Sequence, residues 1–369
     1  MIQNFDYAEG PGSAPGSGPR PARPGLSGLS PDELETLVAA WGEPAYRARQ
    51  LFSWVHGGRA RSFAEMSNLP LGLRETLAVR AVLDTLTILE RRKARDGTTK
   101  YLFRLSDGET VEAVWIPAPG RRTVCLSSQV GCAIGCRFCA TGWGGLVRNL
   151  TAAEIVDQVR LIARDTGQRP TNLVFMGMGE PLANYGNVRR AMELLHAPAG
   201  FGIGWRHHTL STSGIVPGIR RLAGERLPIT LAVSLHAADD ETRSMLVPVN
   251  RRWPISELLK ACREYVACTG RRISFEYVLI RGVNDTRRDA RRLAGLLAGI
   301  LSHVNLIPLN RVPEVGWEAP PPARQREFAR LLEEAGLSVT LRQERGGEIE
   351  AACGQLRRRY APAPSGVGV

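Results

Sequence analysis

The chain has 369 residues, of which 43% are hydrophobic and 23% are charged. That length allows two or three domains with real hydrophobic cores, which excludes a small scaffold held together by disulfides. No apolar run is long enough to span a bilayer, so we expect no membrane association. The first ten residues lack the basic and apolar regions of an export signal. We therefore expect a cytoplasmic protein whose seven cysteines serve metal binding or catalysis before disulfides.

Arginine supplies almost all of the positive charge that gives the chain its formal net charge of +12. Lys93, Lys100 and Lys260 are the only lysines. The planar guanidinium group suits phosphate, and pairs of adjacent arginines recur along the chain. These features favour a polyanionic partner such as RNA. Charge alone leaves an alternative open, namely a general preference for arginine on solvated helix faces.

The first part of the chain changes character twice. Residues 1–27 are mostly Gly, Pro, Ala and Ser, so we expect a disordered tail. Residues 28–95 follow as a basic accessory domain that is helical to about residue 85, and Ser30-Pro31 has the residue types of an N-cap and first helical position. Residues 96–120 alternate apolar and polar positions around Ser106-Asp107-Gly108, which predicts a β-hairpin extension.

Residues 121–345 alternate β-branched runs with helical stretches, as a parallel sheet with crossover helices does. Thr151 and Glu154 form a capping box at the start of the first of these helices. Six strand–helix units predict an α/β fold, a partial or complete TIM-like (βα)6 barrel. Such barrels carry their chemistry on loops at the carboxyl ends of the strands. The predicted strands are 123–128, 172–177, 207–212, 229–235, 272–280 and 303–308.

Three cysteines after the first barrel strand, Cys132, Cys136 and Cys139, form a C-x3-C-x2-C motif. Their thiolates can converge on one inorganic site if the loop wraps around it, and Gly131 and Gly135 permit the backbone geometry that a wrap requires. A structural zinc site needs four ligands, usually from two paired halves, and the sequence has no second half. A [4Fe–4S] cluster held by three cysteines instead leaves one iron open to a small ligand.

With Phe138 before its last cysteine, this motif resembles that of the radical S-adenosylmethionine superfamily. The resemblance implies that Cys132, Cys136 and Cys139 hold a [4Fe–4S] cluster. It also implies that the open iron binds S-adenosylmethionine, which is cleaved to a 5′-deoxyadenosyl radical. A small polar residue at a strand end is usually only a turn cap, but such residues recur here at successive strand ends. The cofactor-binding residues implied in this way are Gly179, Glu180, Ser211, Ser234, Leu235, His236 and Asn310.

Further segments resemble the adenine-C2 RNA methyltransferase family RlmN, whose C8-specific paralogue is Cfr, over about residues 30–356. In that family one S-adenosylmethionine methylates a cysteine corresponding to Cys353, and a second one activates this methyl group for addition to adenine C2. Cys353 lies in residues 346–369, a C-terminal loop with a basic tail. Cys125 matches the cysteine that resolves the protein–RNA adduct through a transient disulfide. The matching segments are 111–117, 123–132, 148–159, 176–185, 231–237 and 348–356.

The chemistry of adenine explains why two extra cysteines are needed. Adenine C2 lies between two ring nitrogens, is electron-poor and does not attack a sulfonium methyl group, whereas a thiolate does and a carbon radical adds to such a carbon. Glu112 matches the family's proton acceptor, and burial among apolar neighbours would raise its pKa toward neutral. The strand pattern by itself favours an outward-facing Glu112. Cys262 and Cys268 we expect in the core.

The resemblance implies two RNA substrates, one adenine of 23S rRNA and the adenosine next to the anticodon of some tRNAs. It also implies an electron donor such as flavodoxin or ferredoxin, and we expect a monomer. Two other functions remain open: C8 methylation of the same rRNA adenine, and an iron–sulfur RNA-binding or regulatory module with an inactive cofactor site. Of the adjacent His207 and His208, we expect one in the core and one on the surface, with RNA contact as the alternative.

Overall fold

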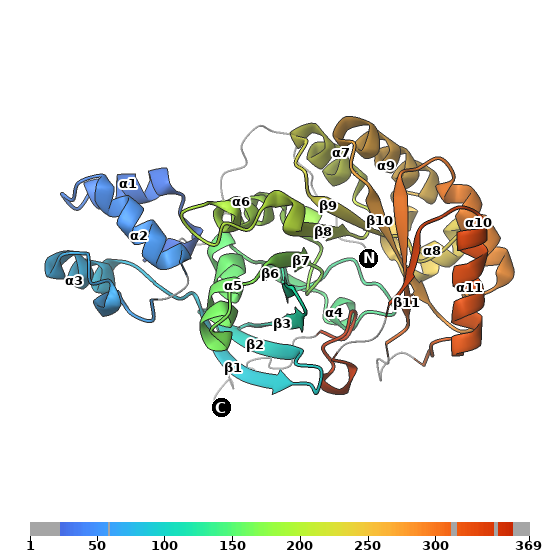
Figure 1. The fold of residues 1–369 in the computed structure, drawn as a ribbon, viewed down its shortest axis with the longest axis horizontal. Helices are drawn as coiled ribbons and strands as arrows, with labels where there is room; N and C mark the ends of the chain where they lie inside the picture. The colour runs from blue at the N-terminus through green and yellow to red at the C-terminus, as the bar shows by residue number, and fades with distance from the viewer. Residues whose placement is uncertain (1–22, 58–59, 311–315, 343–345, 357–369) are drawn as a thin grey trace, which may run out of the picture.

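The computed structural model describes residues 23–57, 60–310, 316–342 and 346–356, and its main feature is one ten-stranded sheet (Figure 1). The first four strands pair antiparallel, and the fourth and all later strands pair parallel. The strands, in their order across the sheet, are β1 (Leu86–Lys93), β2 (Thr99–Leu105), β3 (Thr110–Ala118), β4 (Arg121–Cys125), β7 (Asn172–Phe175), β8 (His208–Thr212), β9 (Thr230–Ser234), β10 (Ile273–Leu279), β11 (Ser302–Pro308) and β12 (Val339–Leu341). The described strands therefore form an open, partial barrel.

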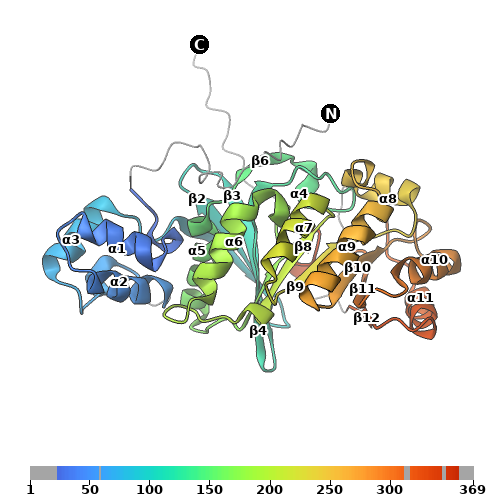
Figure 2. The same cartoon turned by 90° about the horizontal axis from the view of Figure 1, so that it is seen from above.

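Helices cover the convex side of the parallel strands, as crossover connections require (Figure 2). The predicted capping box at the start of the first of them is present, because the Thr151 side chain and the Glu154 backbone and side chain bond reciprocally. None of the described helices is long and apolar enough to cross a membrane. The covering helices are α5 (Ala152–Thr166), α6 (Tyr185–His196), α7 (Val216–Glu225), α8 (Asp240–Leu246), α9 (Ile255–Thr269), α10 (Arg287–Leu297) and α11 (Pro322–Glu334).

Short elements lie in the connections. A small sheet of two strands flanks the cysteine motif and is separate from the main sheet. These elements are β5 (Gln129–Gly131), β6 (Leu146–Asn149), α4 (Ala140–Trp143) and the 3-10 turns η3 (Pro181–Asn184), η4 (Trp205–His207), η5 (Pro248–Arg251) and η6 (Gly347–Ile349).

The six predicted barrel strands are confirmed, with ends that differ by at most three residues. They are detectable because the central positions of each strand include apolar residues that are buried in the core. The expected hairpin is also confirmed: β2 and β3 pair antiparallel, and Gly108 has the left-handed φ of 87° that their turn requires. The sequence missed β12, which is three residues long and pairs with β11 at the sheet edge.

The amino-terminal module is helical, as expected, up to the strand β1. Its elements are η1 (Leu26–Gly28), α1 (Pro31–Ala39), α2 (Tyr46–His56), η2 (Phe63–Glu65) and α3 (Leu71–Arg80). The expected N-cap is a full capping box between Ser30 and Glu33. The strand β1 falls within the range 28–95 assigned to this module, but it pairs with β2 instead.

One boundary was wrong. Residues 1–22 lie outside the described residues, but residues 23–27, expected in the disordered tail, belong to the fold. Leu26 is fully buried in the main core, and its backbone N–H donates to the Val82 carbonyl at 3.0 Å. Composition misled here because a single buried leucine and two backbone hydrogen bonds suffice to anchor a Gly-rich and Pro-rich segment.

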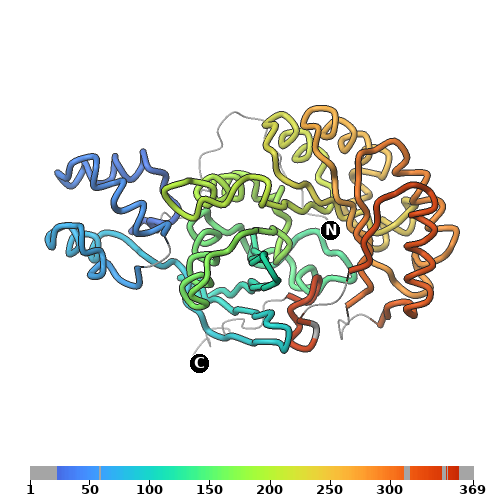
Figure 3. Tube along the Cα trace, viewed as in Figure 1, coloured from blue at the N-terminus to red at the C-terminus, as the bar shows by residue number. Residues whose placement is uncertain are grey.

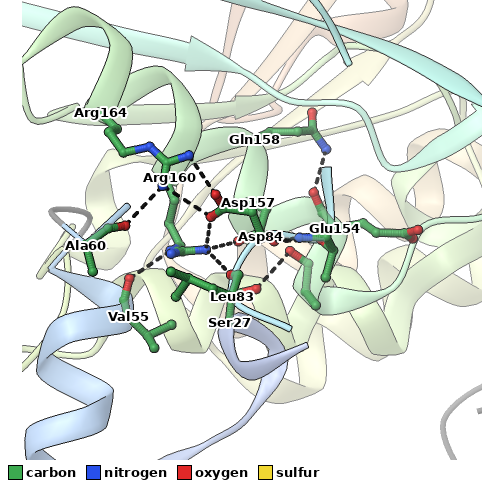
Figure 4. A network of polar contacts seen from close by, with 12 residues as sticks. Ser27, Val55, Ala60, Leu83, Asp84, Glu154, Asp157, Gln158, Arg160 and Arg164 are labelled. Atoms are coloured by element: carbon green, nitrogen blue, oxygen red, sulfur yellow. Dashed lines mark hydrogen bonds and ion pairs between the residues drawn. The ribbon is translucent and has the colours of Figure 1, made fainter. Parts of the chain in front are cut away.

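A buried arginine joins this module to the barrel (Figure 4). Arg160 of α5 is 2% exposed, and its guanidinium donates to the carbonyls of Val55 at 2.7 Å and Leu83 at 2.8 Å. Its charge is balanced by Asp157 and by Asp84, the latter at 3.3 Å. Because both carbonyls belong to the module and Arg160 to the barrel, this network holds the two parts in one arrangement.

Candidate active site

The carboxyl ends of the parallel strands surround a cavity of about 160 Å³ that opens to solvent. This is the position that a barrel fold predicts for chemistry. The cavity brings together most of the residues expected to act. Those that line it are Cys132, Cys136, Cys139, Gly179, Glu180, Ser211, Ser234, His236, Asn310 and Cys353.

The cysteine loop wraps as expected. Gly131 has a φ of 76°, and a Cβ added there would lie 1.9 Å from the Gly145 carbonyl oxygen, so only glycine fits. The Cys132 N–H donates to that same carbonyl at 2.8 Å. Cys139 directly precedes α4. The sequence missed β5 and β6, which pair on either side of this loop and fix its two ends.

The three thiols line the cavity together, and their chemistry fits the ligands of an iron–sulfur cluster. Burial raises the pKa of Cys132 to about 12, and it also raises the pKa values of Cys136 and Cys139. Buried thiols that are close enough to raise one another's pKa become thiolates when a strong positive charge is bound among them. In a cluster each thiolate binds a different iron, so the sulfurs need not share one ion.

Glu180 joins two of the loops at the cavity. Its carboxylate accepts from the Ser213 N–H at 2.7 Å and from the Leu182 N–H at 3.1 Å, so it ties the loop after β7 to the loop after β8. Burial raises its pKa, and the bonds from Ser213 oppose that effect. Gly179 before it has a φ of 101°, and a Cβ there would lie 2.6 Å from the Gln129 side chain. Both residues therefore shape this wall of the cavity.

His236 is a neutral wall residue. Burial, followed by the charge of Arg243, lowers its pKa to about 3. Its Nδ1 accepts from the Val278 N–H at 3.0 Å, and its ring contacts the edge of Phe138 in the cysteine loop. The neighbouring Leu235 is fully buried and does not line the cavity, unlike the other expected cofactor residues.

A buried arginine that the sequence did not single out supports these loops from behind. Arg243 of α8 donates to the carbonyls of Ser213 at 2.7 Å, Ser234 at 3.1 Å and Leu235 at 3.1 Å. It thereby satisfies three carbonyls on the loops after β8 and β9. Nothing in the local sequence marks it, because its partners lie 8 to 30 residues away.

The C-terminal segment 346–356 lies on the concave side of the sheet (Figure 3), and its residues Cys353 and Gly354 line the cavity. The Asn310 side chain donates to the Cys353 carbonyl at 2.9 Å, and the Ala140 N–H donates to the Gly354 carbonyl at 2.7 Å. Cys353 is therefore held beside the cysteine loop, as expected for a residue at the barrel mouth. The basic residues after it lie outside the described part of the chain.

The guanidinium of Arg342 faces the sulfur of Cys353. Its Nη1 lies 3.7 Å from Cys353 Sγ and 3.9 Å from the Glu276 carboxylate. Glu276 is buried on β10, and its other oxygen accepts from Asn305 at 2.9 Å. The Cys353 sulfur is the largest cause of the raised pKa of Arg342. Sequence reasoning missed Arg342 and Glu276.

Cys125 and Glu112 share one face of the sheet. Cys125 at the end of β4 pairs with Val114, and Glu112 precedes Val114 by two positions on β3. Burial raises the pKa of Cys125 to about 12, and the nearby Cys353 raises it further. Cys125 and Cys353 are thus close enough for their charges to interact, although all seven cysteines, each in the described part of the chain, are free. The disulfide implied by the resemblance is not formed in this structure.

Glu112 faces inward, so the outward orientation favoured by the strand pattern is wrong. It is 1% exposed, and its carboxylate lies 3.2 Å from the ammonium of Lys100. The strand pattern misled because both faces of β3 are covered. Glu112 is not among the residues that line the cavity.

The expectations for the other cysteines and for the adjacent histidines are confirmed only in part. Cys262 is buried on the inner side of α9, as expected, but Cys268 near the end of that helix is exposed and is not a core residue. Helical periodicity explains the difference, since positions six apart lie on different faces. His208 is buried and His207 is exposed, which confirms one core and one surface histidine.

Comparison with known proteins agrees with this site. Residues 126–294 match the radical SAM superfamily, and residues 25–83 match the ribosomal RNA large subunit methyltransferase N-terminal domain. A probable dual-specificity RNA methyltransferase RlmN of Symbiobacterium thermophilum is 53% identical over 90% of this chain and 91% of its own. A dual-specificity RNA methyltransferase RlmN of an Anaeromyxobacter species is 50% identical over 95% of this chain and 98% of its own.

A solved structure shares the fold across the same length. The crystal structure of a radical SAM methyltransferase from Sphaerobacter thermophilus has a TM-score of 0.88 and 51% identity, and it covers 90% of this chain and 99% of its own. The superfamily implies a [4Fe–4S] cluster and S-adenosylmethionine as cofactors. The extent of these matches assigns the chain to a family. The chain belongs to the RlmN family of dual-specificity RNA methyltransferases, within the radical SAM superfamily.

Proposed function

We propose that this enzyme methylates C2 of adenine in 23S rRNA and in tRNA, with Cys353 as the carrier of the methyl group. The observation that supports this most directly is the position of Cys353. A cysteine more than 200 positions away in sequence lines the same cavity as the three motif cysteines, and its charge acts on Cys125. A direct polar methyl transfer to C2 needs neither Cys125 nor Cys353. Transfer through a carrier needs one cysteine to carry the methyl group and a second to release the product.

Cys132, Cys136 and Cys139 are the residues that would hold the [4Fe–4S] cluster. When bound, the cluster supplies the electron that cleaves S-adenosylmethionine and so generates the radical chemistry. The loops of Gly179 and Glu180, together with small polar groups at later strand ends, form the wall against which S-adenosylmethionine binds. The strand-end groups assigned to it are Ser211, Ser234, Leu235, His236 and Asn310, of which only Leu235 does not line the cavity.

Cys353 acts first as a nucleophile. Its thiolate attacks the sulfonium methyl carbon, a new C–S bond forms, and S-adenosylhomocysteine leaves with the electron pair of the broken bond. Arg342 supports this step by position, because its guanidinium donates toward the Cys353 sulfur at 3.7 Å and holds it at the cavity. The methyl group then sits on a side chain at the mouth of the cavity, where RNA can reach it.

Cys125 and Glu112 complete the transfer to RNA. Glu112 accepts the proton that adenine C2 must lose, a task for a carboxylate shielded from water. The Cys125 sulfur attacks the Cys353 sulfur, and the bond between the Cys353 sulfur and the transferred carbon breaks. The electron pair of that bond leaves with the base, and a proton completes its methyl group. The Cys125–Cys353 disulfide that remains must be reduced before the next cycle. The proximity of the two thiols supports this role.

RNA binding is assigned to the arginine-rich surface and to the helical part of the amino-terminal module, residues 28 to about 85. The formal charge of +12 favours a polyanionic substrate, and phosphate contacts of arginine supply most of such affinity. The enzyme acts as a monomer in the cytoplasm and draws electrons from a small donor such as flavodoxin or ferredoxin.

Anaerobic reconstitution followed by nucleoside chromatography tests the proposal. The reduced protein with S-adenosylmethionine and 23S rRNA or tRNA should release 5′-deoxyadenosine and produce 2-methyladenosine. Recovery of 8-methyladenosine alone would show a C8 enzyme, and intact S-adenosylmethionine would show an inactive cofactor site. Cys125→Ala should accumulate a covalent protein–RNA species, whereas free, fully methylated RNA from that variant would remove Cys125 from the mechanism.

A further inference from the structure

Lys100 stands out because this chain uses arginine for almost every cation. It is one of three lysines, and it lies within β2 with only 3% of its surface exposed. A lysine is almost never fully buried unless its ammonium is paired. The mechanism described above assigns it no task.

The ammonium of Lys100 connects two parts of the site. Its Nζ lies 3.2 Å from Glu112 Oε1 and donates to the backbone carbonyl of Glu350 at 3.0 Å. Glu350 has a left-handed φ of 53° and precedes Cys353 by three residues. One side chain therefore contacts both the proposed proton acceptor and the segment that carries the methyl group.

The strand register places these groups on a common face. Lys100 pairs with Val114, and Val114 pairs in turn with Cys125 on the other side. Glu112 lies two positions from Val114, so all four side chains point to the same side of the sheet. That side is where the C-terminal segment packs, since Lys100 bonds to Glu350 and Cys125 neighbours Cys353.

The ion pair between Lys100 and Glu112 bears on the ability of Glu112 to accept a proton. A carboxyl group buried as deeply as Glu112 favours its neutral form, which cannot accept a proton. An ammonium group at 3.2 Å favours the carboxylate. The Lys100 ammonium also donates a hydrogen bond to the Glu350 carbonyl. It therefore couples the charge state of Glu112 to the docking of residues 346–356.

We infer that Lys100 is a positioning residue for the RNA step: its ammonium pairs with the Glu112 carboxylate and connects it to the segment that carries Cys353. This inference rests on the proposed function of Glu112 and Cys353. It separates the two half-reactions, because methylation of Cys353 does not use Glu112, whereas loss of the C2 proton does. Removing Lys100 therefore spares the first and damages the second.

Four variants and one control test the inference in the anaerobically reconstituted full chain. The variants are Lys100→Met, Lys100→Arg, Glu112→Gln and Lys100→Met combined with Glu112→Gln. The control is Lys93→Met, which removes the same charge from an exposed position at the end of β1. Three quantities are measured for each: methylation of Cys353 by peptide mass spectrometry, 5′-deoxyadenosine release, and 2-methyladenosine formed in RNA.

Lys100→Met and Glu112→Gln should each keep the first two quantities within about threefold and lose about 100-fold in RNA product, the scale of a general base. The double variant should lose no more than the worse single variant, because the two residues act as one unit. Lys100→Arg keeps the positive charge and can still donate to both Glu112 and Glu350. It should therefore restore the RNA product to at least about a tenth of the level of the parent protein. Lys93→Met should match the parent protein.

Several results would overturn the inference. Normal RNA product from Lys100→Met beside a loss in Glu112→Gln would remove Lys100 and leave the proposed function intact. Normal product from Glu112→Gln would show that the proton acceptor was misassigned, and the inference falls with it. An equal loss of all three quantities in a folded Lys100→Met protein, not recovered by Lys100→Arg, would show a purely structural lysine. If Lys100→Met does not fold, Lys100→Gln carries the same test, since it keeps a donor without the charge.

Discussion

Cys353 is held by residues from three separate parts of the chain, and Arg342 is the one that faces its sulfur. Its guanidinium donates toward that sulfur at 3.7 Å and so positions it at the cavity. Arg342→Gln should slow methylation of Cys353 by S-adenosylmethionine about tenfold, because the sulfur loses this positioning contact. The rate is followed by mass spectrometry of the Cys353 peptide. Arg330→Gln, an exposed arginine on α11, is the matched control, and equal rates in both variants would contradict the assignment.

Gly131 allows the cysteine loop to close on itself. Because a Cβ there would meet the Gly145 carbonyl at 1.9 Å, Gly131→Ala should displace the loop and lower the iron and sulfide content after reconstitution to less than about half. Gly144→Ala is the matched control, since Gly144 lies in the same loop, lacks a left-handed φ and has open space around its Cα. Full iron content in Gly131→Ala would show that the loop does not need this geometry.

At the scale of elements, α5 connects the barrel to the amino-terminal module through Arg160. Arg160→Met leaves Asp157 buried without its cation and frees two carbonyls, so it should cost about 3–5 kcal/mol of unfolding free energy. Hydrogen exchange should rise first in α2 and η1, which pack on this helix. An exposed pair gives the control: Arg292→Met should cost less than about 1 kcal/mol. Equal stability of the two variants would show that the network does not hold the module.

The sequence predicted the elements that have a strong local pattern. The six barrel strands, the N-cap at Ser30 and the capping box at Thr151 belong to this group, because apolar runs and cap residues act over a few positions. The strands β5 and β12, each three residues long, were not detectable, since so short a run has no measurable alternation. The sequence alone also placed residues 23–27 in a disordered tail, although Leu26 anchors them in the core.

In the candidate site, too, the sequence predicted the local features and missed the contacts between distant residues. The cysteine motif and the strand-end loops were visible because they are contiguous in sequence. The contacts of Lys100 with Glu112, Arg243 with Ser234, and Arg342 with Cys353 were not, because strand register and loop packing create them between distant positions. The orientation of Glu112 depends on what covers the second face of β3, which no local pattern contains.

At the scale of the whole molecule, buried histidines make stability depend on pH. Burial lowers the pKa of His56 to about 3, and Arg160 lowers it further. An unfolded His56 takes up a proton below pH 6.5 while the folded one stays neutral, so its contribution is present above pH 6.5 and lost as pH falls toward 3. The loss is at most about 1.4 kcal/mol per pH unit. His56→Phe should therefore make the fall in Tm between pH 7 and pH 5 shallower, and an unchanged fall would contradict this origin.

The central claim is that the methyl group reaches RNA through Cys353, and an isotope experiment tests it most directly. The protein is first loaded with a deuterated methyl group on Cys353, freed of the donor, and then given RNA and unlabelled S-adenosylmethionine for one turnover. We expect 2-methyladenosine that carries deuterium, with the label lost from the Cys353 peptide. Unlabelled 2-methyladenosine, with the deuterated methyl group still on Cys353, would contradict the account.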